Sequence, residues 1–197
     1  MTPASSTTRP LRADARKNRD AILSAAREAF EDEGVLVSLD GIALRAGVGN
    51  ATLYRNFATR EDLLAAVIES SIEAALVEAD VLASSLTPQE ALAEWLVSLA
   101  WQLRRWHDLP TCVASALTES ASPMASACSP LQDRTAELLA RAQASGDASD
   151  AVTGDDLYTL VTALSWGIDR FGDDEAAARR RVALATAGVF REPARAS

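Results

Sequence analysis

The chain has 197 residues, of which 48% are hydrophobic and 24% charged, and its formal net charge at pH 7 is −9. This composition is ordinary for a globular protein and allows one sizeable domain, or a small domain joined to a larger one. No apolar run approaches the roughly 20 residues that span a bilayer, and the N-terminus lacks the apolar block of a secretory signal. The only cysteines, Cys112 and Cys128, argue against a disulfide framework or a structural zinc site and favour a reducing cytoplasm.

The periodic apolar patterns in the first part of the chain are helical. The first predicted helix has its apolar face at Ile22, Leu23, Ala26 and Phe30. Gly34 follows it as a suitable C-cap, and Ser38 is a suitable N-cap for a short second helix. Gly47-Val48-Gly49 interrupts that helix, and a third short helix follows it. Thr59 then caps a long fourth helix.

Further helices are predicted in the second part of the chain. Thr87-Pro88-Gln89-Glu90 combines a capping box with proline at the first helical position. Ser129-Pro130-Leu131-Gln132 repeats this pattern and predicts a helix to about Ala144, with residues 119–128 as a loop. Thr153 opens another helix, which Gly172 separates from a last one over about 173–190. We therefore expect an all-α protein of about nine helices.

Residues 38–57 have the pattern of a helix-turn-helix. Ala43 supplies the small residue needed where two helices cross, Gly47 supplies the turn residue with positive φ, and Leu53 returns an apolar face to the first helix. The outward positions of the second helix are Asn50, Ala51, Thr52, Arg55 and Asn56. Small groups allow close approach to a major groove, and Arg and Asn hydrogen-bond to base edges. The pattern indicates a DNA-binding domain.

The distribution of charge reconciles this interpretation with a negative net charge. Residues 1–62 carry nine Lys or Arg and nine Asp or Glu, whereas residues 63–197 carry ten against nineteen. Before residue 28 the basic residues are Arg9, Arg12, Arg16, Lys17, Arg19 and Arg27, opposed only by Asp14 and Asp20. A basic arm on a neutral small domain is compatible with DNA binding. The alternative is that this basic segment has no role, because such tails are common.

The stretch from Ala21 to Ser70 resembles the DNA-binding domain of the TetR/AcrR family. The resemblance is carried, in order and spacing, by Ala25, Phe30, Gly34, Ile42-Ala43, Ala46-Gly47-Val48, Leu53-Tyr54, Phe57 and Leu63-Leu64. It covers roughly a quarter of the chain. It implies a ligand-responsive transcriptional regulator, usually a repressor, that binds a near-palindromic operator in double-stranded DNA as a cytoplasmic homodimer.

The resemblance also implies a domain organisation. We expect a disordered basic arm at 1–13, a three-helix DNA-binding domain with the helix-turn-helix at 14–60, a helical ligand-binding and dimerisation domain at 61–190, and a disordered tail at 191–197. The expected homodimer would use the last two long helices, and its predicted contacts are Leu157, Leu160, Leu164, Ile168, Val182 and Val189. The alternative for these side chains is the internal core.

Within the DNA-binding domain, the resemblance implies that Ser38 and Tyr54 contact phosphates. Members of the family often have Lys near the start of the fourth helix and Ser after the glycine turn, where this chain has Arg60 and Gly49. The full set of predicted DNA contacts is Ser38, Arg45, Gly49, Asn50, Ala51, Thr52, Tyr54, Arg55, Asn56 and Arg60. Tyr54 has the alternative role of a half-buried aromatic that braces the motif.

The resemblance further implies a pocket for an unidentified small-molecule effector in the larger domain. The predicted lining is Trp95, Leu99, Trp106, Met124, Tyr158 and Trp166, with core packing as the alternative. His107, the only histidine, is expected to be structural. We expect no cofactor and no metal.

Two classes of protein compete with a regulator. An enzyme is disfavoured because the sequence has no nucleophile elbow, P-loop, GxGxxG or cluster of metal ligands. A helical interaction protein would explain the amphipathic helices but not the polar run from Asn50 to Arg55 beside Gly47. A DNA-binding protein that acts without any effector is a further alternative.

Overall fold

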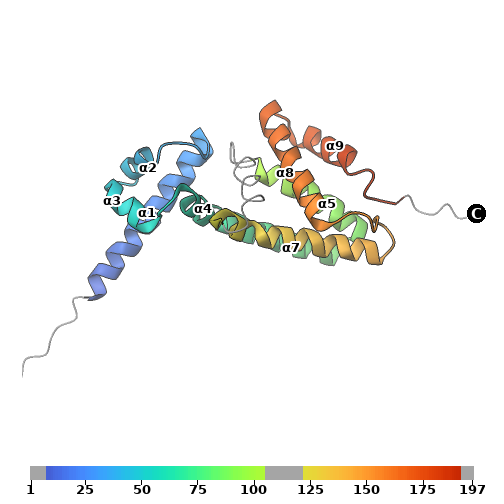
Figure 1. Ribbon diagram of the computed structural model, residues 1–197, viewed down its shortest axis with the longest axis horizontal. Coiled ribbons are helices and arrows are strands. Elements are labelled where there is room, and N and C mark those ends of the chain that lie inside the picture. The colour runs from blue at the N-terminus through green and yellow to red at the C-terminus, as the bar shows by residue number, and fades with distance from the viewer. Residues whose placement is uncertain (1–7, 105–121, 192–197) are drawn as a thin grey trace, which may run out of the picture. The chain divides into compact units, whose positions relative to one another are not determined.

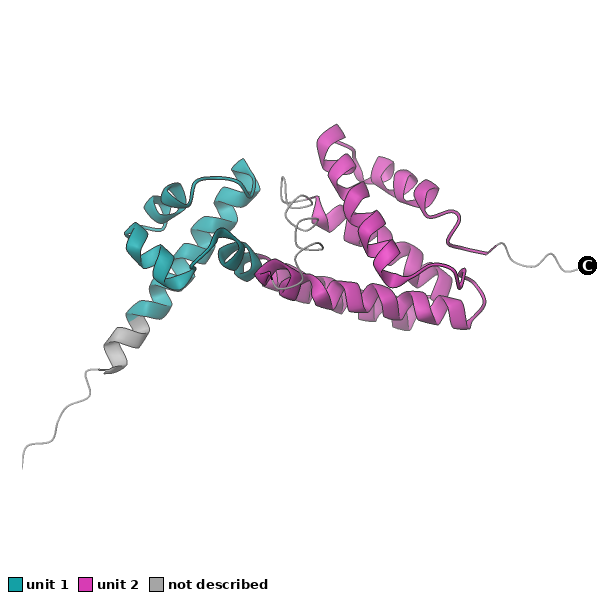
Figure 2. Cartoon of the chain, in the orientation of Figure 1, with its two compact units in different colours: residues 1–67 teal, residues 68–197 magenta. Residues whose placement is uncertain are grey.

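The computed structural model describes residues 8–104 and 122–191, and for residues 8–13 it describes the backbone only. The chain divides into two compact units, residues 1–67 and 68–197 (Figure 2). The boundary between the units therefore lies inside the fourth helix, seven residues later than the expected division between 60 and 61. Each unit is described by itself below.

The described residues form helices, and the single β-bridge among them joins Ala148 to Phe190. The helices are α1 (Thr8–Glu33), α2 (Leu39–Arg45), α3 (Asn50–Asn56), α4 (Arg60–Ser85), α5 (Pro88–Leu103), α7 (Pro123–Ala144), α8 (Gly154–Phe171) and α9 (Glu175–Ala185) (Figure 1). These eight helices confirm the expected all-α class. No described helix is both long enough and apolar enough to cross a bilayer.

The N-terminal unit is built on the apolar face of α1. Ile22, Ala26 and Phe30 are completely buried, and α2 and α3 pack on α1 and on each other. Gly34 ends α1 with a positive φ of 86°, as the sequence predicted. Thr59 begins α4 by accepting a hydrogen bond from the Asp62 backbone N–H at 3.1 Å, while its own N–H donates to the Asp62 carboxylate at 2.9 Å. Two reciprocal bonds thus fix the start of α4.

Helix α1 begins earlier than the sequence predicted. Residues 8–13, which were expected to belong to a disordered arm, have a helical backbone continuous with the rest of α1. The segment contains no glycine, and Pro10 lies in the first turn, where a missing backbone N–H costs no helical hydrogen bond. The remaining part of the expected arm, residues 1–7, lies outside the described residues.

The C-terminal unit is organised around α5, which packs against α7, α8 and α9. Trp95 is completely buried, and its Nε1–H donates to the hydroxyl of Thr135 on α7 at 2.9 Å. Gly154, the first residue of α8, is where α8 and α7 approach most closely, since a Cβ added there would lie 2.6 Å from the Ala136 Cβ. Glycine is therefore required at this crossing.

Helix α5 starts with the predicted capping box, and α8 starts after Thr153, as predicted. Thr87 and Glu90 exchange side-chain and backbone hydrogen bonds at the start of α5, and Thr153 and Asp156 do the same for α8. The hydrogen bond from the Thr153 hydroxyl lowers the pKa of the Asp156 carboxyl, and the Thr153 backbone N–H adds to this effect. The sequence alone was sufficient here because a capping box involves only neighbouring residues.

Two predicted boundaries in this unit are wrong. Helix α7 begins at Pro123, with Ser122 as its N-cap, so residues 123–128 are helical and Pro130 lies inside the helix. Burial of Met124 and Cys128 in the core favours this longer helix over the predicted loop. Helix α9 ends at Ala185, and the chain then turns so that Ser149 donates to the Val189 carbonyl at 2.9 Å.

Candidate nucleic-acid interface

The turn between α2 and α3 has the geometry that the helix-turn-helix pattern predicted. Gly47 has φ = 67°, a conformation that favours glycine. The Val48 N–H donates to the Ala43 carbonyl at 3.0 Å, which closes the end of α2. Ala43 on α2 and Leu53 on α3 are each only 1% exposed, and the two short helices pack on each other. This packing fixes the side of α3 that remains at the surface.

The exposed side of α3 carries the predicted polar residues. Asn50, Ala51, Tyr54 and Arg55 are exposed, whereas Thr52 and Asn56 are half-buried. Tyr54 is 48% exposed, so both of its predicted roles, phosphate contact and brace, remain compatible with its position. The Arg55 guanidinium donates to the Ala51 carbonyl at 3.0 Å and to the Thr52 hydroxyl at 3.1 Å.

Other predicted contacts surround α3. Ser38 is the exposed N-cap of α2 and makes no capping hydrogen bond with its side chain, which leaves its hydroxyl available to a phosphate. Gly49 is the exposed N-cap of α3. Asn50 donates to the Asp40 carboxylate at 2.8 Å, and Arg45 forms an ion pair with Glu33 at the end of α1. Both side chains keep further hydrogen-bonding groups that these partners do not use.

Arg60 differs from the other predicted contacts. Its Nη1 donates to the carbonyls of Val35 and Val37, at 2.8 Å and 2.6 Å, and the side chain is half-buried. The guanidinium thus ties the connector between α1 and α2 to the first turn of α4. Arg60 therefore supports the frame of the unit, because unpaired carbonyls in a partly buried turn would be costly, and its predicted DNA contact stays a prediction.

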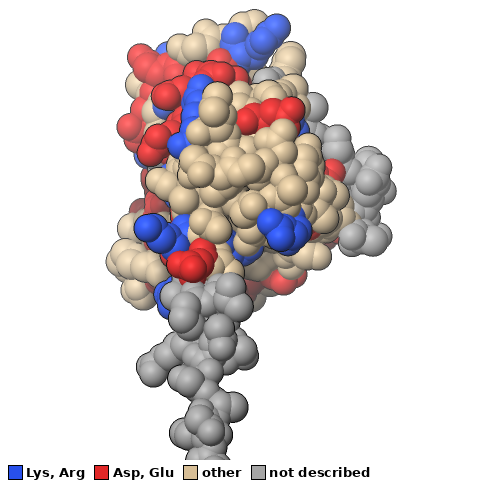
Figure 3. All heavy atoms as spheres, turned by 90° about the vertical axis from the view of Figure 1, so that its left-hand side faces the viewer, with Lys and Arg blue, Asp and Glu red and all other residues tan. Residues whose placement is uncertain are grey.

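The charge on this side of the molecule is distributed unevenly. Figure 3 views the side on which α2 and α3 lie, and shows uncharged groups over its centre with basic groups at several points around them. Acidic groups gather mainly toward the upper left of that view. A central surface without acidic groups can approach the polyanionic DNA backbone without strong repulsion.

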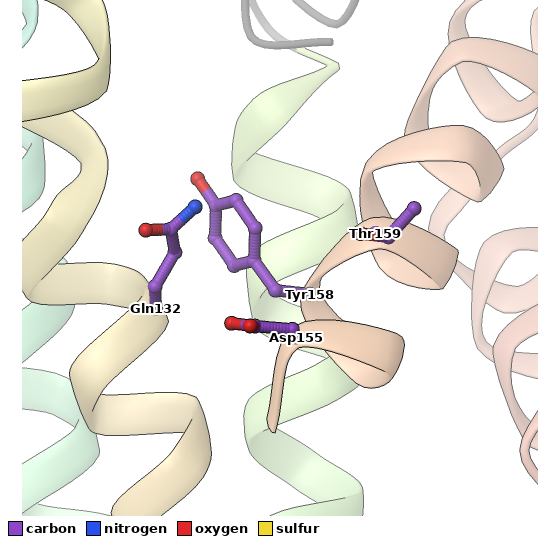
Figure 4. A pocket seen from close by; sticks show the side chains of 4 residues that line it. All are labelled: Gln132, Asp155, Tyr158 and Thr159. Atoms are coloured by element: carbon purple, nitrogen blue, oxygen red, sulfur yellow. The ribbon is translucent and has the colours of Figure 1, made fainter. Parts of the chain in front are cut away.

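A second candidate site lies in the C-terminal unit, beside Tyr158 (Figure 4). A pocket of about 250 Å³ is lined by Gln132, Asp155, Tyr158 and Thr159. Figure 4 shows the Gln132 amide beside the Tyr158 hydroxyl, whereas Thr159 points away from them. The Tyr158 side chain is completely buried, and its hydroxyl has no hydrogen-bond partner among the described residues.

Burial also determines the ionisation of this region. Desolvation raises the pKa of Tyr158 well above its ordinary value, and the neighbouring Cys128 thiol raises it further. Burial raises the pKa of the Cys128 thiol as well. Both groups are therefore neutral at physiological pH, and the phenol is a hydrogen-bonding group rather than a charge.

Only some of the residues predicted to line the effector pocket are buried together in the C-terminal unit. Trp95, Leu99, Met124 and Tyr158 are all buried in the C-terminal unit. Trp166 is 48% exposed and lies outside this core, so its assignment to the pocket stays a prediction. Its position falls off the apolar stripe of α8, and that spacing was visible in the sequence. Trp106 and His107 lie outside the described residues.

The predicted dimer contacts also divide into two groups. Leu157, Ile168, Val182 and Val189 are buried in the core of the protomer itself, which favours the alternative of internal packing for these four side chains. Leu160 and Leu164 are partly exposed. The sequence-based set did not include Phe171, which is 71% exposed, or Leu184, which is 81% exposed. Apolar spacing identifies the apolar face of a helix but does not say whether the chain or a partner covers it.

An exposed α3, held by a glycine turn against α2 in a small three-helix unit, defines a DNA-binding protein of the helix-turn-helix class. Comparison with known families agrees with this class. Residues 22–67 match the model described as bacterial regulatory proteins of the tetR family. Residues 87–190 match the model of the C-terminal domain of SbtR-like transcriptional regulators. The chain belongs to the TetR family of transcriptional regulators, and as a member it is not an enzyme.

Individual relatives are similar to this chain over its N-terminal part or over most of its length. An HTH-type transcriptional regulator of Staphylococcus aureus strain USA300 is 39% identical over 64 residues, which are 32% of this chain and 35% of that protein. The matched stretch thus spans about a third of the curated relative. The TetR regulator SCO0520 of Streptomyces coelicolor is 27% identical, with a TM-score of 0.58 over 89% of this chain and 99% of that one.

A third similarity concerns the fold alone. Thermus thermophilus FadR, a TetR-family repressor crystallised with lauroyl-CoA, has a TM-score of 0.65 at 23% identity, over 91% of this chain and 98% of that one.

Arg60 and Arg55 make a matched pair of tests. We expect Arg60→Gln to lower the free energy of unfolding by about 1–3 kcal/mol, because two carbonyls lose their donor. We expect Arg55→Gln to unfold at the wild-type temperature and to bind DNA more weakly, since Arg55 contacts only its own exposed helix. Thermal unfolding and binding to genomic DNA fragments separate the two effects. If Arg60→Gln unfolds at the wild-type temperature and binds DNA more weakly, Arg60 contacts DNA and does not support the fold.

Proposed function

We propose that this protein is a repressor that binds a near-palindromic operator as a homodimer and is released from DNA by a small-molecule effector. The observation that carries the proposal is the exposed face of α3, where Asn50, Tyr54 and Arg55 surround small side chains. These types suit a major groove because amide and guanidinium groups bind base edges and small groups allow close approach. As a member of its family the protein acts in the cytoplasm, where it reaches the DNA.

Selection of bound sites from genomic DNA tests the operator. We expect one near-palindromic sequence to be enriched, with affinity falling steeply as salt rises, because phosphate contacts release counterions. We expect Tyr54→Phe to weaken binding to the enriched site several-fold by removing one phosphate hydrogen bond, with unchanged thermal stability. Enrichment of no sequence over random fragments would contradict the proposal.

The homodimer would cover an apolar flank of α8. Leu160, Leu164, Gly167 and Phe171 recur at steps of four, three and four residues, which places them along one side of a helix. Leu160 and Leu164 are partly exposed and Phe171 is largely exposed. A single helix-turn-helix makes few base contacts, so a two-fold symmetric pair provides the specificity that an operator needs.

A charge placed on this flank tests the dimer. We expect Phe171→Glu to convert the protein to a monomer in light scattering at micromolar concentration, because the carboxylate would be desolvated beside Arg181, whose charge is already paired with Asp173. Val77→Glu is the matched control, because Val77 is 64% exposed on α4 and the same charge there leaves a dimer intact. A dimer that tolerates Phe171→Glu as well as it tolerates Val77→Glu would exclude this flank as the interface.

The effector site is proposed at Tyr158. The buried Tyr158 hydroxyl lies beside the Cys128 thiol, a weak hydrogen-bonding group, and a ligand with a stronger polar group would satisfy it better. The described lining beside it is polar, so the apolar part of a ligand would have to reach beyond Gln132, Asp155 and Thr159. Binding of lauroyl-CoA by the Thermus relative supports an effector with an apolar chain.

Compounds that release the protein from its selected site test the effector. Lauroyl-CoA and a panel of smaller apolar acids and phenols are the first to try. We expect Tyr158→Phe to fold and bind DNA as the wild type does, since its hydroxyl has no partner among the described residues. The same variant should need roughly tenfold more effector for release, as expected when one buried hydrogen bond is removed. Equal effector response in both proteins would remove Tyr158 from the site.

A further inference from the structure

Four arginines follow a helical spacing in the first part of α1. Arg9, Arg12, Arg16 and Arg19 are separated by three, four and three residues. Positions with this spacing share one side of an α-helix, and α1 is helical from Thr8 onward. Together they span about 15 Å along the helix axis, at 1.5 Å per residue. These four positions are called the arginine stripe below.

The described end of the arginine stripe lies against the end of the recognition helix. The Arg19 guanidinium carbon is 4.5 Å from the centre of the Phe57 ring. Phe57 is the C-cap of α3 and is only 2% exposed, so its position is fixed by the core of the unit. Arg19 itself is exposed. The stripe therefore starts beside α3 and continues along α1 toward the N-terminus.

The next member of the stripe, Arg16, is not neutralised by any described residue. Arg16 is exposed and has no ion pair or hydrogen bond among the described residues. Asp14 falls on the opposite side of α1 by its spacing, whereas Asp20 is the i+4 neighbour of Arg16 on the helix surface but forms no ion pair with it in the described structure. By contrast, Arg45 is paired with Glu33 and Arg60 is held by backbone carbonyls in the same unit.

We infer that the arginine stripe binds the phosphate backbone of the DNA that flanks the bases read by α3, and so lengthens the DNA segment covered by each protomer. This inference rests on the proposed operator binding. Guanidinium groups suit phosphates because they offer paired donors and a permanent charge. Double-stranded DNA is the partner favoured here because the stripe adjoins α3. A duplex bound by α3 would therefore lie beside the stripe.

Duplexes of two lengths test this inference with the full-length protein. One duplex carries the selected site with long random flanks, and the other is trimmed to the site. We expect Arg12→Gln/Arg16→Gln to bind the long duplex roughly tenfold more weakly and the trimmed duplex as the wild type does. The slope of log affinity against log salt should fall by about 0.9 for each phosphate that the variant no longer neutralises.

Lys17→Gln is the matched control for position. Lys17 is exposed, belongs to the same helix and carries the same charge, but it lies about 100° around the helix from Arg16. We expect a single Arg16→Gln change to reduce the salt slope and Lys17→Gln to leave it unchanged, with equal thermal stability in both proteins. Two results would contradict the inference. One is an equal reduction of the salt slope in Arg16→Gln and Lys17→Gln, and the other is equal loss of affinity of Arg12→Gln/Arg16→Gln for the long and the trimmed duplex.

These outcomes are distinct from failure of the proposed function. If the wild type enriches no site in the selection, operator binding itself fails. If the wild type binds its site and Arg12→Gln/Arg16→Gln binds the long duplex with wild-type affinity and salt slope, operator binding stands and only the arginine stripe is rejected.

Discussion

The packing of α2 against α3 around the Gly47 turn is the constraint on which the DNA-binding surface depends. Ala43 and Leu53 are both buried, and Gly47 turns the chain between the two helices through a positive φ. This packing fixes the rotation of α3 about its axis, so Leu53 faces inward while Tyr54 and Arg55 face outward. A helix of seven residues would not be stable alone in water, and its orientation comes from this packing.

Charged residues are distributed unevenly between the two parts of the chain. The excess of acidic residues lies after residue 62, and the first 62 residues carry equal numbers of acidic and basic residues. Within the N-terminal unit the arginines have different environments: Arg60 binds carbonyls, Arg45 binds Glu33, and Arg16 is unpaired in the described structure. Arginines thus have different roles in this unit: one holds backbone carbonyls, one forms an ion pair and one is unpaired. The role depends on the groups that the fold places near each guanidinium.

The C-terminal unit shows why apolar spacing alone does not locate an interface. Leu157 and Ile168 lie on the buried side of α8, whereas Phe171 lies on the flank that remains exposed. All three belong to one amphipathic helix, and the sequence cannot say which flank faces α5 and α7. Tyr158 is similar, since its place on the stripe predicted burial but not that its hydroxyl would lack a partner among the described residues.

The sequence by itself determined the helical class, the helix-turn-helix at 38–57 and the starts of α5 and α8, because each depends on residues a few positions apart. Capping boxes, glycine turns and helical spacing are local, so they can be recognised before any contact is known. Only the tertiary structure decided that Arg60 binds Val35 and Val37, that Trp166 is exposed and that α7 begins at Pro123. Those outcomes depend on which distant side chains compete for the same space and the same hydrogen bonds.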